Sequence, residues 1–251
     1  MPDITGETLV LFVTAFLMFV TGGVVKGTLG VGLPLVVVPL LSLLFDAPVA
    51  IGLLVLPVLV SNGLQAFEGG RLIFALKRFG MLIGAQFFAT LWANDWGSKL
   101  SPREINAVIA FTVLSAVAVM LLSPKGEIPK KSEWWVGPAV GAIAGAMGGA
   151  SSLTGPILIT YLMALRLDRN EFVGSISIIY LLGSIPMYTA MWMWGRFGLD
   201  ALAWSCAGLV PMYLGLKIGA QIRHRLSEES FRRVLLGFLI FLAILLVLND
   251  G

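Results

Sequence analysis

The sequence predicts an all-α integral membrane protein made of two inverted repeats, each with a Gly-rich broken opening helix pair followed by three transmembrane helices. Three observations lead to this prediction. The composition is strongly apolar, long apolar segments alternate with short charged clusters, and the two halves of the chain resemble each other.

The composition indicates a lipid environment. Of the 251 residues, 58% are hydrophobic and 12% are charged, with a mean hydropathy of +0.93. Soluble domains carry about 25% charged residues, so this chain is far more apolar than an aqueous core requires. The net charge of +3 does not indicate a nucleic-acid partner, because the basic residues border apolar segments and act as topology signals.

The apolar segments set the expected helices. Several are close to the ~20 residues that span a bilayer, and the others are shorter. They cover residues 8–25, 33–45, 48–67, 79–92 (with a possible start at 72), 104–122, 134–147, 156–165, 172–194, 199–219 and 231–248.

The halves of the chain match when one is shifted by 122 residues. This shift pairs Pro34 with Pro156 and Gly52 with Gly174. The sequence therefore predicts a first repeat over residues 1–123, a cytoplasmic linker over 124–133, and a second, inverted repeat over 134–251. Paired repeats of this kind are typical of secondary transporters.

The Lys and Arg residues predict the orientation. If each opening helix pair returns the chain to its starting side, one side receives 13 of the basic residues and the other receives 3. The positive-inside rule then makes the basic side cytoplasmic and places both termini outside. The expected location is the inner (plasma) membrane, where the chain is multi-pass.

Two Gly-rich breaks interrupt the apolar sequence, at residues 25–34 (VKGTLGVGLP) and 145–156 (GAMGGASSLTGP). Each ends in a proline, which is tolerated in the first turn of a helix. Free N–H groups and the positive helix dipole gather at such a start. Irregular backbone at membrane depth survives only where protein buries it or where it lines a watery cavity, so the breaks predict a transport site.

Lys26 gives the first break a positive charge within apolar sequence. A cation beside two helix N-termini describes a site for an anion, and an intramembrane charge is a functional candidate. The alternative is that Lys26 extends along the helix to the cytoplasmic interface.

The candidate substrate-binding residues are the polar and glycine positions of the breaks, with four polar residues on the long helices that follow. Interhelical hydrogen bonding is the alternative for those four, and close helix packing is the alternative for the glycines. The candidates are Lys26, Gly27, Thr28, Gly30, Gly32, Asn62, Gln65, Gly148, Gly149, Ser151, Ser152, Thr154, Tyr180 and Ser184.

These motifs resemble those of the sulfite exporter TauE/SafE family of membrane permeases. The resemblance covers almost the whole chain and is carried by residues 26–34, 50–52, 145–156 and 168–174. It implies export of a small sulfur-containing anion, sulfite or an organosulfonate. The second break has Ser151 and Ser152 but no lysine, so the two half-sites are not expected to be equivalent.

Other functions remain as alternatives. One is an importer of sulfate, thiosulfate or a sulfonate, which would use the same site. The other is an anion channel, which an observation of saturable flux would exclude. The chain is not expected to be an enzyme, because it has one histidine, His224, and one cysteine, Cys206, and no carboxylate pair. No cofactor or metal is expected, the partners are the anion and the lipid bilayer, and the sequence specifies no oligomeric state.

Overall fold

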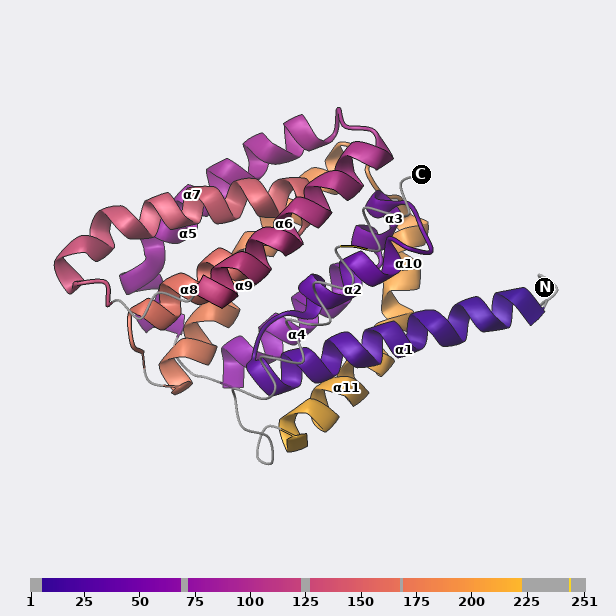
Figure 1. The fold of residues 1–251 in the computed structure, drawn as a ribbon, viewed down its shortest axis with the longest axis horizontal. Helices are drawn as coiled ribbons and strands as arrows, with labels where there is room; N and C mark the ends of the chain where they lie inside the picture. Colours follow the sequence, from indigo (N-terminus) through magenta and orange to yellow (C-terminus); the bar gives the residue numbers. More distant parts are fainter. Residues whose placement is uncertain (1–5, 69–71, 123–126, 168, 223–243, 245–251) are drawn as a thin grey trace.

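A computed structural model of the chain describes residues 6–68, 72–122, 127–167, 169–222 and 244. These residues form helices and turns, and none of them lies in a strand (Figure 1). In chain order the helices are α1 (Gly6–Leu29), α2 (Leu33–Leu41), α3 (Ala47–Gly52), α4 (Val55–Glu68), α5 (Leu72–Gly97), α6 (Pro102–Leu122), the short 3₁₀ helix η1 (Lys130–Ser132), α7 (Glu133–Ser151), α8 (Gly155–Ala164), α9 (Arg169–Met193), α10 (Leu199–Ala207) and α11 (Leu209–Ile222).

Four helical stretches in the described part of the chain are long and apolar enough to cross a bilayer. They are Thr8–Thr28, Ala47–Phe67, Leu72–Gly97 and Glu171–Met193. Helices α10 and α11, bent by 41° relative to each other, make a fifth candidate when they are counted as one span. The all-helical, multi-pass membrane architecture expected from the sequence is confirmed at this level.

The helix bounds differ from the sequence prediction at several places. Of the two starts left open for the segment ending at 92, the structure has the one at Leu72, and α5 continues to Gly97. The segment predicted at 33–45 ends as a helix at Leu41, and the segment predicted at 48–67 is divided between α3 and α4. The segment predicted at 199–219 is divided at Gly208, which lies between α10 and α11. The predicted segment 231–248, His224 and Asp168 lie outside the described residues, apart from the helical Ile244.

Glycines join distant parts of the chain at two helix contacts. On α1, Gly23 and Gly27 meet the backbone of α11, and on α7, Gly145 and Gly149 meet the backbone of α5. A Cβ at any of these four positions would collide with a backbone oxygen of the opposite helix. The absence of a side chain thus permits the backbones to approach closely, as is common between transmembrane helices. Figure 1 shows α11 beside α1 and α5 beside α7.

Two apolar clusters hold the fold together. The first contains α2 and α3 with parts of α1, α4 and α6, and the second contains parts of α5, α7, α8 and α9. Leu33 and Leu153, which lie within the two breaks, are fully or almost fully buried in the first cluster. The breaks are therefore inside the protein and not at its lipid-facing surface.

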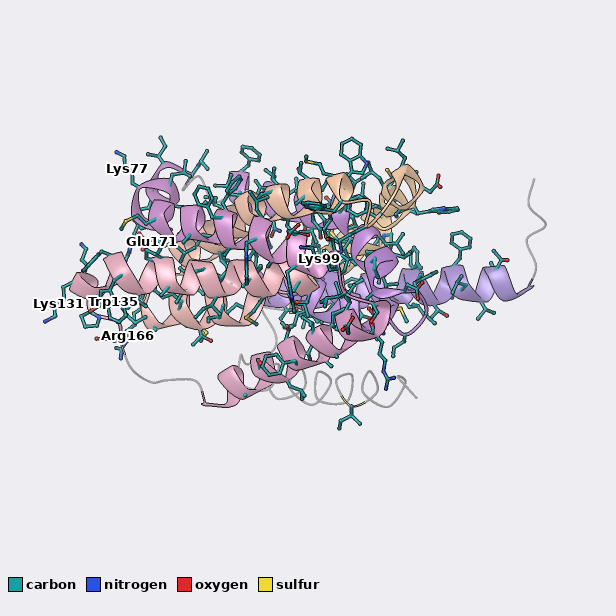
Figure 2. The ribbon with its side chains drawn as sticks, turned by 90° about the horizontal axis from the view of Figure 1, so that it is seen from above. Lys77, Lys99, Lys131, Trp135, Arg166 and Glu171 are labelled. Carbon is teal, nitrogen blue, oxygen red and sulfur yellow. The ribbon has the colours of Figure 1, made fainter. Side chains whose placement is uncertain are left out.

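Several charged residues gather at one end of the molecule. Lys77, Lys131 and Arg166 lie there together with Glu171, and Lys99 lies well away from them (Figure 2). Many large apolar side chains are exposed, such as Phe88 and Phe111, both 72% exposed. So many exposed apolar side chains fit a lipid-facing surface.

Candidate functional site

The first break is built by glycine at two backbone positions. Helix α1 ends at Leu29, and α2 begins at Leu33 with Pro34 in its first turn. Between them Gly30 has a φ of 81° and Gly32 a φ of 103°, in the left-handed region where glycine carries no Cβ penalty. The chain reverses here and leaves the N-terminus of α2 inside the protein.

The second break makes a similar turn with a different residue. Helix α7 ends at Ser151, Ser152 follows with a φ of 63°, and α8 begins at Gly155. Ser152 is thus a non-glycine residue in the left-handed conformation, which costs roughly 1–2 kcal/mol. Such strain at a buried polar residue points toward function.

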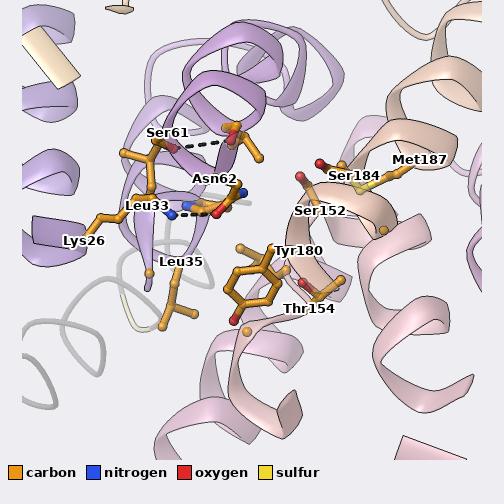
Figure 3. Close-up of a pocket in the computed structure, with 16 residues that line it drawn as sticks. Lys26, Leu33, Leu35, Ser61, Asn62, Ser152, Thr154, Tyr180, Ser184 and Met187 are labelled. Carbon is orange, nitrogen blue, oxygen red and sulfur yellow. Dashed lines mark hydrogen bonds between the residues drawn. The ribbon is translucent and has the colours of Figure 1, made fainter. Parts of the chain in front are cut away.

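A small cavity of about 30 Å³ lies between the two breaks, which is room for a ligand only slightly larger than water. It is lined from α1, α2, α4, α8 and α9 and from the second break itself (Figure 3). The sequence-predicted residues that line it are Lys26, Gly32, Asn62, Ser152, Thr154, Tyr180 and Ser184. Residues that are separated by more than 120 positions in the chain therefore face one cavity.

Lys26 supplies the charge of this cavity. Its side chain is 1% exposed, and its Nζ donates a hydrogen bond of 2.7 Å to Oδ1 of Asn62. The side chain therefore points into the protein and does not extend along α1 to the interface. No carboxylate among the described residues pairs with Lys26. An ammonium has three donors, so the asparagine orients the group without neutralising it.

Hydroxyl groups complete the lining on the opposite side. Ser184 lines the cavity, and its hydroxyl donates to the carbonyl oxygen of Leu181 at 3.0 Å, so its one proton is already in use. The hydroxyl of Tyr180 is buried without a hydrogen-bond partner in the described part of the chain. It lies near the start of α8, where a Cβ on Gly155 would be 3.1 Å from it. A free donor at a helix N-terminus suits a negatively charged ligand.

The structure places the other predicted glycines in packing contacts or at the turn. Gly27 meets α11, Gly149 meets α5, and Gly148 lies against the Thr154 side chain. Gly30 forms the first turn without lining the cavity. These positions match the packing alternative given above for the glycines.

The remaining predicted polar residues form hydrogen bonds between or within helices. Thr28 donates to Val24 and Gly219 carbonyl oxygens. Gln65 accepts a bond of 3.2 Å from Ser177, and Ser151 donates to Met147 at 2.8 Å. None of the three lines the cavity, so interhelical bonding describes Thr28 and Gln65 better than ligand contact.

Sequence reasoning missed the lining residues that contribute backbone or apolar surface. They are Leu33, Pro34, Leu35, Val58, Leu153, Gly155, Gly183 and Met187. Ser61, which also lines the cavity, is a polar residue of the same long helix as Asn62 and was open to prediction on that ground. The 122-residue shift offers one clue, because it pairs Ser61 with Gly183.

Comparison with known proteins decides the family. The family model for the sulfite exporter TauE/SafE matches residues 15–246. The chain belongs to the TauE/SafE family. Searches of curated proteins and of solved structures gave no match.

Membership of the TauE/SafE family makes this chain a multi-pass membrane transporter of sulfur-containing anions. The cavity agrees with such a substrate in sign of charge and donor chemistry. Lys26 offers positive charge, and the Tyr180 hydroxyl, which has no hydrogen-bond partner among the described residues, can donate to an anionic oxygen. The cavity lining contains neither His nor Cys nor a carboxylate, and the described residues hold no group of three such side chains suited to a metal ion.

Proposed function

We propose that this protein exports sulfite or an organosulfonate across the inner membrane, and that the substrate binds in the cavity between the two breaks. The observation that carries the proposal is the buried Lys26, whose ammonium meets a neutral amide instead of a carboxylate. No described residue supplies a counter-ion to this buried charge, and burying a charge unpaired is costly, so an anion that enters the cavity offsets this penalty.

An inverted-repeat plan is supported by the helix bounds. Helices α1 and α7 end at Leu29 and Ser151, and α2 and α8 begin at Leu33 and Gly155. Both pairs are separated by 122 residues, the shift found in the sequence. Gly30 and Ser152, which both have a left-handed backbone conformation, are also 122 positions apart.

The cavity lining has the same relationship. Five pairs of lining residues are 122 positions apart: Gly32 and Thr154, Leu33 and Gly155, Val58 and Tyr180, Ser61 and Gly183, Asn62 and Ser184. We infer that the cavity lies on a pseudo-two-fold axis between the repeats, which is where secondary transporters bind their substrates. Lys26 has Gly148 as its counterpart, so the positive charge comes from one repeat only.

Charge and orientation support the outward direction in this proposal. The cluster of Lys77, Lys131 and Arg166 at one end of the molecule supports the predicted cytoplasmic side. A membrane potential of 100 mV, negative inside, is worth about 2.3 kcal/mol per elementary charge and drives an anion outward. Export therefore needs no intramembrane carboxylate for proton coupling.

The test is flux of radiolabelled sulfite from proteoliposomes under an imposed potential. We expect saturable flux that follows the potential, and loss of this flux in Lys26→Gln. Lys77→Gln is the matched control, because Lys77 is an exposed lysine of α5 away from the cavity. If Lys26→Gln transports as well as Lys77→Gln, the anion role of Lys26 is refuted. Non-saturating flux indicates a channel, and uptake that only an ion gradient drives indicates an importer.

A further inference from the structure

A row of polar side chains leads away from the Lys26 cavity along α5. Gln86, Thr90 and Asn94 follow at four-residue spacing, so they share one helix face and extend over about 12 Å. They are 1%, 1% and 0% exposed. The amide of Gln86 lies against Gly183 of α9, which itself lines the cavity. The row, here called the α5 polar row, therefore begins next to the candidate substrate site.

A buried cation lies at the other end of the α5 polar row. Arg196, in the turn between α9 and α10, has its Nη1 3.5 Å from Oδ1 of Asn94 and 3.3 Å from the carbonyl oxygen of Gly149. Its Nε and Nη2 are buried, and neither has a hydrogen-bond partner within the described ranges. Burial lowers the pKa of Arg196, yet a guanidinium stays protonated at any physiological pH.

Two members of the α5 polar row, Gln86 and Thr90, also lack partners for their side chains in the described part of the chain. Both polar atoms of the Gln86 amide and the hydroxyl of Thr90 are buried and make no hydrogen bond to any described residue. Polar groups between membrane helices usually hydrogen-bond across the interface and stabilise it. Leaving them unpaired is costly. Helix association alone therefore does not account for these side chains.

A second helix pair shows that a glycine contact between helices does not require polar side chains such as those of the α5 polar row. Helices α7 and α5, and helices α1 and α11, make the same contact, in which a glycine meets a backbone carbonyl oxygen of the opposite helix. The contacts are Gly145 with Gln86 and Gly149 with Thr90 in one pair, and Gly23 with Met212 and Gly27 with Leu216 in the other. At equivalent positions, α11 thus has methionine and leucine where α5 has glutamine and threonine.

Unpaired polar side chains at a glycine contact are expected to find partners when the contact opens. We propose that the α5 polar row lines the route by which the anion passes between the Lys26 cavity and the outer face, and that Arg196 attracts the anion at the mouth of this route. The identity of the anion and the outward direction rest on the proposed function. In the present conformation the close approach of α7 to α5 closes the route.

This arrangement has a stepwise charge pattern. The anion leaves one buried cation, Lys26, meets the neutral donors of the α5 polar row, and reaches a second cation, Arg196. The second charge compensates the loss of the first, because hydrogen bonds to charged groups are stronger than neutral ones. Water enters with the anion and satisfies the amide and hydroxyl groups that are unpaired when the route is closed.

Charge-selective labelling tests the route without using sulfite. The chain has one cysteine, so Cys206→Ser gives a background free of thiols. In this background Thr90→Cys is the reporter, and Leu216→Cys, its counterpart on α11, is the matched control. Methanethiosulfonate reagents that carry either a sulfonate or a trimethylammonium group are added outside intact cells, and both rates are measured with and without Arg196→Gln.

We expect both reagents to modify Thr90→Cys and neither to modify Leu216→Cys. The sulfonate reagent reacts faster, and Arg196→Gln lowers the ratio of the two rates by at least about tenfold, the Coulomb effect of one charge about 10 Å away at an effective dielectric constant of about 20. Asn94→Cys replaces the reporter if Thr90→Cys does not elute as a folded protein on size-exclusion chromatography.

Three results overturn the proposal: labelling of the reporter no faster than the control, labelling whose charge preference Arg196→Gln leaves unchanged, or labelling from the cytoplasmic side only. The flux of Lys26→Gln is measured in parallel. Loss of flux with unlabelled Thr90→Cys refutes the route and leaves the substrate site standing. Labelled Thr90→Cys with unaffected flux in Lys26→Gln refutes the role of Lys26 and leaves the route standing.

Discussion

Replacing Asn62 by aspartate tests whether the cavity needs the uncompensated charge of Lys26. The side chain keeps its shape, and a carboxylate oxygen takes the place of the amide oxygen 2.7 Å from the Lys26 Nζ. The new ion pair neutralises the ammonium. Folding is not expected to suffer, because the buried cation gains a partner of opposite charge.

The expected loss of affinity follows from Coulomb's law. An anion about 4 Å from the new carboxylate meets a repulsion of about 4 kcal/mol at an effective dielectric constant of about 20. This energy corresponds to roughly a thousandfold weaker binding, since about 1.36 kcal/mol is a factor of ten. Sulfite flux below saturation is therefore expected to fall to the background of empty liposomes.

The assay combines radiolabelled sulfite flux with thermal unfolding of the purified protein. Gln65→Glu is the control, because Gln65 lies one turn further along α4 and bonds Ser177 without lining the cavity. We expect a much smaller loss of flux there. Flux in Asn62→Asp within threefold of the unmutated protein, with normal unfolding, refutes the idea that a free ammonium binds the substrate.

Three further substitutions test the helix contacts and the second break. Gly145→Val places a Cβ against a backbone oxygen of α5, so we expect a midpoint of thermal unfolding several degrees lower, whereas Gly84→Val, with open space around its Cβ, leaves the midpoint nearly unchanged. Ser152→Gly removes a left-handed Cβ penalty of roughly 1–2 kcal/mol, so the midpoint is expected to rise, and an unchanged midpoint counts against strain at this residue. Gly155→Ala puts a methyl group 3.1 Å from the Tyr180 hydroxyl, so sulfite flux is expected to fall several-fold while the unfolding midpoint stays unchanged. The double variant Gly155→Ala with Tyr180→Phe relieves this contact, but if the hydroxyl binds the anion it is not expected to recover full flux.

Glycine and proline have strong local effects, and they marked residues 25–34 and 145–156 as breaks. In the structure α1 continues to Leu29 and α7 to Ser151, so only residues 30–32 and 152–154 lie between the helices. Sequence reasoning thus made both breaks too long. It also predicted several polar lining residues, since polar side chains are conspicuous in apolar sequence. Lys26 and Asn62 were two of these.

The sequence did not show which polar residues face inward. Gln65 is as conspicuous as Asn62, yet it lies three positions further on α4 and bonds Ser177 of α9. Choosing between them requires the rotation of α4 about its axis, which tertiary packing sets. Gly183 was missed for a related reason, because a glycine that borders a cavity has the same one-letter signal as a glycine in a packed interface.

The contacts of α1 with α11 and of α5 with α7 have a consequence for how far each half of the chain can fold alone. Each opening helix finds its glycine partner in the other half of the sequence, so neither half buries its own glycine face. The two halves therefore depend on each other for their packing, and either half produced without the other would leave a glycine face without its partner helix.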